Sequence, residues 1–113
     1  MDSLMRVMGK DQKGRAVMFK MVRGALEGGM QPMDDADTAV RDGRPGEAAR
    51  ILHSLRGAVG VLGAKRLVKA TLDAESAIRV GNPEMLPIVL AAVRLELEQV
   101  LAQGRRWLEQ EDR

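Results

Sequence analysis

The chain has 113 residues and a mass of 12.4 kDa, which is enough for one domain with one hydrophobic core. Hydrophobic residues make up 45% and charged residues 30%, a balance typical of a globular protein rather than a disordered one. Aromatic residues reach only 2%, and this composition favours helices over a β-sandwich or barrel. The absence of cysteine excludes disulfides, thiol nucleophiles and cysteine-ligated metals, and a single histidine excludes a histidine-rich zinc site.

Membrane insertion and export are not indicated by the sequence. The longest apolar stretch, residues 85–93, is too short to span a bilayer and contains Pro87. The first residues, MDSLMRVMGKD, lack the charged start and the long apolar core of a signal peptide. We therefore expect a reduced, cytoplasmic domain.

The first part of the chain predicts a short helix followed by a long, interrupted one. Residues 3–8 fit a short helix that Gly9 stops. Asp11 can cap a second helix, and Gly28, Gly29 and Pro32 interrupt its pattern before apolar residues resume at 33–40. We expect a kinked or broken long element, with its first apolar positions spaced by threes and fours: Val17, Met18, Met21, Val22, Ala25 and Leu26.

The rest of the chain predicts three further helices with short connections. A turn at 42–46, with Pro45 near the next helix start, precedes a helix over 47–62 and another over about 64–80. In 81–83, Gly81 fits a C-terminal cap, Asn82 an N-cap and Pro83 a first helical position for the last helix. The expected core positions are Ala48, Leu52, Leu55, Val59 and Leu62, then Leu67, Thr71, Ala74 and Ile78, then Leu86, Leu90, Val93, Leu97, Val100, Leu101 and Leu108.

Amphipathic helices joined by short connections predict an all-α fold. We expect an antiparallel four-helix bundle, with the short N-terminal helix lying across one end as a cap. Residues 1–113 are expected to form a single domain, and a complete core of four helices makes a monomer the simpler prediction.

Positive charge is concentrated in the middle of the chain. The net charge of +2 is too small to indicate nucleic acid by itself, but no acidic residue lies between Glu47 and Asp73. This segment is either a solvated helix face or a surface for an anionic partner. It contains the only histidine together with five cations: His53, Arg50, Arg56, Lys65, Arg66 and Lys69.

The helical phase places His53 on the outer face of its helix, about 130° from the centre of the apolar stripe. Gly57 and Gly60 lie on the same face, where each weakens a helix by about 1 kcal/mol relative to alanine and clears space beside the imidazole. Gly60 fits a packing role equally well. A neutral imidazole is a usable nucleophile, but phosphoryl transfer also needs charge neutralisation and usually a metal. A nucleophile with one cation a turn away therefore indicates a group carrier rather than a complete active site.

The run from His53 to Ala64, HSLRGAVGVLGA, resembles the signature of histidine phosphotransfer (HPt) domains. That signature reads His, any residue, Leu, Lys, Gly, and then Leu-Gly-Ala five to seven residues later. The resemblance extends to the turn at 41–43, to residues 72–81 and to residues 4–22, and so covers roughly the whole chain. Arg56 stands where the family usually has lysine.

The resemblance implies a phosphorelay intermediate rather than an enzyme. His53 would accept a phosphoryl group from an aspartyl phosphate on a response-regulator receiver domain and pass it to another receiver. Arg56 would stabilise the phosphoryl charge, and Gly57 would provide clearance for the receiver. The chain itself would need no cofactor, because the receiver would supply Mg²⁺. The expected docking positions near His53 are Ala49, Arg50, Gly60 and Ala64.

Two other functions fit the same residues. In the first, the bundle is a docking module that is not phosphorylated, and Arg50, Arg56 and Arg66 bind an acidic partner. The second, nucleic-acid binding, is disfavoured by the lack of a recognition motif and of aromatic residues for stacking. The sequence leaves open whether the chain is free-standing or belongs to a hybrid sensor kinase.

Overall fold

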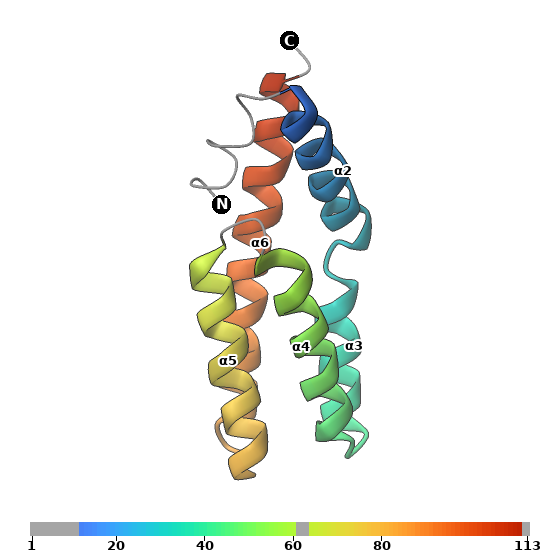
Figure 1. Cartoon of the computed structure of the whole chain (residues 1–113). Coiled ribbons are helices and arrows are strands. Elements are labelled where there is room, and N and C mark those ends of the chain that lie inside the picture. Colours follow the sequence, from blue (N-terminus) through green and yellow to red (C-terminus); the bar gives the residue numbers. More distant parts are fainter. Residues whose placement is uncertain (1–11, 61–63, 112–113) are drawn as a thin grey trace.

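The computed structural model describes residues 12–60 and 64–111, which are helical apart from short connections (Figure 1). Within these ranges there is no β-strand, and no helix is long and apolar enough to cross a membrane. The prediction of an all-α fold is therefore confirmed. The expected capping helix at residues 3–8, the capping role of Asp11 and the burial of Leu62 lie outside the described residues. The helices are α2 (Gln12–Gly28), α3 (Gln31–Arg41), α4 (Pro45–Gly60), α5 (Lys65–Val80) and α6 (Leu86–Glu111).

Four helices form an antiparallel bundle, as expected. Along the chain, α3 packs on α4, α4 on α5 and α5 on α6, and α3 also contacts α6 (Figure 1). Since each connection reverses the chain direction, neighbouring helices are antiparallel. The main core draws on all four: Met33, Leu52, Leu55, Val59, Leu67, Ala70, Ala74, Leu90, Val93, Leu97, Val100 and Leu101.

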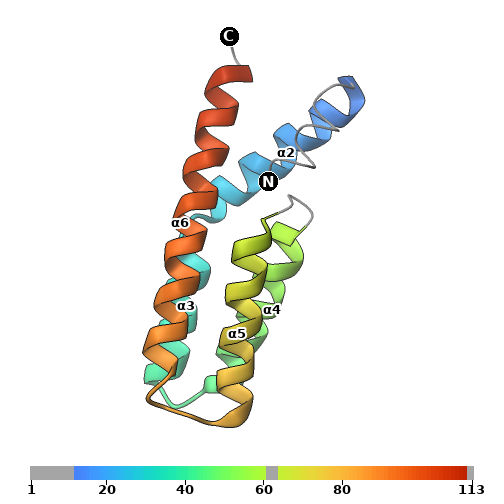
Figure 2. The ribbon, with the colours of Figure 1, turned by 90° about the vertical axis from the view of Figure 1, so that its left-hand side faces the viewer.

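The long N-terminal element is broken into α2 and α3, which confirms the predicted interruption. Gly29 has a φ of +55°, a left-handed conformation that favours glycine, and its N–H donates to the carbonyl of Ala25 at 3.0 Å. Pro32 then occupies the first turn of α3, where its missing N–H costs little. The break allows α2 to run in a different direction from the helices of the bundle (Figure 2).

The C-terminal half of α6 extends past the bundle and packs against α2 as a two-helix arm. Met18 and Val22 are buried there, and the rings of Phe19 and Trp107 lie 5.1 Å apart. Gly104 allows the close approach, because a Cβ at this position would lie 3.1 Å from a methyl group of Val22. The arm gives the molecule its elongated shape, 46 by 20 by 18 Å (Figures 1 and 2).

Two local predictions about the helix ends have different outcomes. Gly81 caps α5 in the left-handed conformation, with φ of +78°, as predicted. The prediction that Asn82 and Pro83 start the last helix is wrong, because α6 begins at Leu86. Asn82 instead accepts a hydrogen bond on its side-chain oxygen from the N–H of Glu84, at 3.2 Å, and so stabilises a turn before the helix.

Most of the predicted core positions are buried, and the exceptions lie at the helix ends or on the arm. Ile78, Leu86 and Leu108 are only half-buried. Val17, which belongs to the apolar pattern of the second helix, is 43% exposed. It lies on α2, which contacts α6 but is not enclosed by the bundle, so one neighbour cannot cover its whole apolar face.

Candidate functional site

His53 lies on the outer face of α4, as the helical phase predicts. The side chain is 72% exposed, while the preceding residue, Leu52, is fully buried in the core. The next core residue on the helix, Leu55, is also buried. The core contacts of α4 therefore fix the helix so that the imidazole faces solvent.

Two side chains contact the imidazole on its Nδ1 side. Arg56, one turn later on α4, places Nη2 at 2.7 Å from Nδ1 of His53. Glu75 on α5 places Oε1 at 3.6 Å from the same nitrogen. Arg56 and Glu75 also form an ion pair through Nη1 and Oε2, and their side chains are only 21% and 19% exposed. The result is a small network in which Arg56 touches both the histidine and the carboxylate.

Glu75 is the residue that the sequence analysis missed. It belongs to the following helix, and its role depends on the antiparallel pairing of α4 with α5. One signal was present in the pattern. Glu75 follows the buried Ala74 and lies one turn after the buried Thr71, so it is an acidic residue at the edge of the α5 core face. The sequence analysis named no carboxylate next to the ring nitrogens of His53, and Glu75 is that residue.

The glycine next to the network leaves open space. A Cβ on Gly57 would meet no atom within 4 Å, so the surface beside His53 and Arg56 is cleared of side chains. A Cβ on Gly60 would lie 3.9 Å from Val68 of α5, an ordinary contact distance. Packing against α5 therefore does not require a glycine at either position.

The expected docking positions are only partly brought together. Arg50 and Gly60 are exposed on α4, and Ala49 is half-buried. Ala64 is 4% exposed and belongs to the core, so its assignment to the docking surface is wrong. Helical phase counted from His53 would place residue 64 on the same face, but the described part of α4 ends at Gly60 and Ala64 directly precedes α5.

Acidic residues of α5 and α6 pair with three of the five cations in the basic segment. Arg56 pairs with Glu75, and Lys69 pairs with Asp73. Arg66 reaches Glu96 of α6 at 3.1 Å, which places it on the α5–α6 side of the bundle. Arg50, Arg56 and Arg66 therefore do not form one basic surface, and within the described ranges Arg50 takes part in no ion pair.

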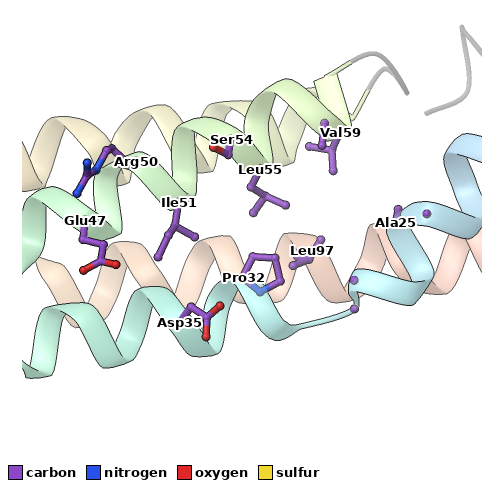
Figure 3. A pocket seen from close by; sticks show the side chains of 14 residues that line it. Ala25, Pro32, Asp35, Glu47, Arg50, Ile51, Ser54, Leu55, Val59 and Leu97 are labelled. Carbon is purple, nitrogen blue, oxygen red and sulfur yellow. The ribbon is translucent and has the colours of Figure 1, made fainter.

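A groove of about 660 Å³ lies beside the site, between α4 and the α2–α3 break (Figure 3). Ser54 and Arg50 of α4 belong to its wall, and both are close to His53 in the helix. Figure 3 shows Ile51 and Leu55 pointing from α4 toward Pro32 on the opposite wall. The outer ridge of α4 thus has the Arg56–Glu75 network on its α5 side and an apolar groove on its α3 side.

No set of side chains in the described part of the chain is arranged to hold a metal ion. The His, Asp and Glu residues there form no group of three or more with that geometry. The polar groups around the imidazole are one cation and one carboxylate, both within 4 Å of Nδ1. The site therefore offers a nucleophile next to one positive and one negative side chain.

Comparison with known proteins identifies the family. The chain matches the family model of the Hpt domain over residues 20–103. It belongs to the Hpt domain family. The matched range contains His53, Arg56 and Glu75, together with all of α3, α4 and α5. No curated protein and no solved structure gives a significant match.

Hpt domains carry a phosphoryl group on a histidine in phosphorelays and interact with the receivers of response regulators. They are phosphocarriers rather than enzymes. The only histidine of this Hpt domain is His53, at the site described above.

Proposed function

We propose that His53 accepts a phosphoryl group from the aspartyl phosphate of one receiver domain and passes it to the aspartate of another. The observation that carries this proposal is a 72% exposed imidazole whose Nδ1 side is occupied by Arg56 and Glu75. Since Nδ1 is covered by these two side chains, Nε2 is the nitrogen available to a partner.

The transfer needs a lone pair on Nε2. In the neutral tautomer with its proton on Nδ1, the Nε2 lone pair forms the nitrogen–phosphorus bond. At the same time the bond between phosphorus and the oxygen of the aspartyl phosphate breaks, and its electrons leave with the carboxylate. Nδ1 keeps its proton, and the ring gains positive charge. Glu75, at 3.6 Å from Nδ1, is placed to stabilise that charge.

Arg56 would supply positive charge to the transferred group. Its guanidinium lies on the Nδ1 side of the ring, at 2.7 Å from that nitrogen, and would turn toward Nε2 to neutralise charge on the phosphoryl oxygens as they approach. We assign to the receiver the Mg²⁺ ion and the acidic residues that hold it. The protein itself then acts as a carrier without a cofactor of its own.

The receiver would approach along the outer ridge of α4. Gly57 has open space above it, so a partner backbone can come close to the imidazole without meeting a side chain. Arg50 is exposed one turn before His53 and would meet the acidic rim of the receiver site. Ala49 and Gly60 complete the small-residue surface on this ridge. We further propose that the domain works in the cytoplasm as a monomer.

A docking module without phosphorylation is the alternative function. It would use Arg50 as its main exposed cation, because Arg56 and Arg66 already pair with glutamates. Such a module would bind a partner equally well with or without the imidazole.

The decisive experiment is phosphoryl transfer from a set of phosphorylated receiver domains, with Mg²⁺, to the wild type and to His53→Gln. We expect acid-labile, alkali-stable label on the wild type only. The folded stability of the variant should stay within about 0.5 kcal/mol of the wild type, because the side chain is exposed. If no receiver labels His53 while some still bind both proteins, the docking module is correct and the carrier proposal is wrong.

A further inference from the structure

The network around His53 holds the ring in a state that is not ready to react. Nδ1 has a donor, Arg56, at 2.7 Å and an acceptor, Glu75, at 3.6 Å. A guanidinium has only donors, so Nδ1 must accept the bond from Arg56. The proton of the neutral ring then lies on Nε2, the exposed nitrogen, which has no lone pair free for a phosphorus atom in this tautomer.

From this geometry we propose that Arg56, besides stabilising the phosphoryl charge, restrains His53 until a phosphoryl group arrives. The inference rests on the proposed function of His53 as the phosphoryl acceptor. A phosphoryl group near Nε2 carries more negative charge than a neutral imidazole and attracts the Arg56 guanidinium away from Nδ1. Nδ1 then takes a proton from water and donates it in a hydrogen bond to Glu75, while Nε2 releases its proton to water. The lone pair needed for attack becomes available only in this second arrangement.

The two terminal nitrogens of Arg56 make its two contacts separately. Its Nη1 binds Glu75 and its Nη2 binds His53, so one planar group bridges both partners. A lysine has a single ammonium group at the end of its chain. We expect it to stay with the charged and more buried Glu75 and to leave Nδ1 free. Arg56→Lys therefore keeps the positive charge at the site but removes the restraint.

The test is the tautomer of the ring, measured by nitrogen-15 NMR on the full chain above the titration range of imidazole. The protein has one histidine, so the assignment is unambiguous. We expect the proton mainly on Nε2 in the wild type and mainly on Nδ1 in Arg56→Met, a change of about tenfold or more in the ratio. Arg56→Lys should shift the ratio in the same direction. Arg66→Met, which removes the pair with Glu96 on the other side of α5, should leave it unchanged.

A wild-type ring with its proton on Nδ1 would overturn the proposal, as would a ratio that Arg56→Met leaves unchanged. A second measurement compares phosphoryl acceptance from the same phosphorylated receiver. Arg56→Lys should accept faster than the wild type by a factor of about three to ten, and a slower variant would show that Arg56 imposes no restraint. The NMR ratio needs no receiver. It would therefore still report the Arg56 contact if the comparison with His53→Gln showed that the chain accepts no phosphoryl group.

Discussion

Arg94 and Arg56 each bridge neighbouring helices of this bundle, and they differ in what they bind. Arg94 of α6 donates to Asp34 and Asp37 of α3, at 3.0 and 2.7 Å. Arg56 of α4 binds Glu75 of α5 and Nδ1 of His53. The partners of Arg94 are both carboxylates, which only accept hydrogen bonds when ionised, so one arrangement satisfies the network. An imidazole nitrogen can donate or accept, so the network of Arg56 has two possible arrangements.

The comparison separates a bridge that holds two helices together from one that also controls a nucleophile. Both arginines link antiparallel helices of the same bundle, and both are less than half exposed. Only the bridge of Arg56 ends on an exposed group with nucleophilic chemistry and with an open surface beside it at Gly57. Position in the bundle therefore does not distinguish function from stability, whereas the chemical type of the second partner does.

The matched variants Arg56→Met and Arg94→Met should give the largest contrast. Each substitution removes the ion pairs between two helices but keeps a long apolar side chain. Each should therefore destabilise the fold by about 1–2 kcal/mol. Arg56→Met should also slow phosphoryl acceptance by about tenfold to a hundredfold. The variant frees His53 to adopt the reactive tautomer, but it also loses the positive charge that stabilises the transition state, and the second effect is larger. Chemical unfolding and transfer from a phosphorylated receiver measure the two effects.

The control is the transfer rate of Arg94→Met, which should equal that of the wild type. An equal loss of rate in both variants would mean that Arg56 acts only through folding, and the contrast between the two bridges would disappear.

Gly57→Gln should slow transfer less than Arg56→Met does, and it should stabilise the fold rather than destabilise it. The position is exposed and has open space around it, so a glutamine there improves helix propensity and raises stability by up to about 1 kcal/mol. The same side chain occupies the path of the receiver and should slow transfer by about tenfold.

The matched control for that variant is Gly46→Gln. Gly46 lies on the first turn of α4 and also has open space around it. Transfer should be unaffected there. A normal rate in Gly57→Gln would show that the receiver does not approach across this part of α4.

Much of this architecture was predictable because helical periodicity depends on local spacing. The core stripe of α4 predicted both the burial of Leu52 and the exposure of His53, and the glycines predicted the break before α3. Glu75 was missed because its contact with His53 depends on how two antiparallel helices align, which local spacing does not determine. Ala64 was misplaced for a related reason, since helical phase predicts orientation only while the same helix continues.

The smallest effect we predict is a difference in salt dependence between the two bridges. The pair of Arg56 and Glu75 is more buried than the pair of Arg94 and Asp34. Their side chains are 21% and 19% exposed in the first pair, and 33% and 59% exposed in the second. The hydrogen bonds to Asp37 and then Asp34 raise the pKa of Arg94, so its stabilising contribution is complete below the ordinary arginine range and is lost only at higher pH. Arginine titration therefore adds no pH dependence near neutrality, and salt is the useful variable.

In about 1 M salt, where screening acts over about 3 Å, the destabilisation by Arg94→Met should shrink by about half. That of Arg56→Met should change less, because solvent ions reach the more buried pair less well. Urea unfolding at low and high salt measures both, and a larger salt effect on Arg56→Met would contradict the difference in burial between the two bridges.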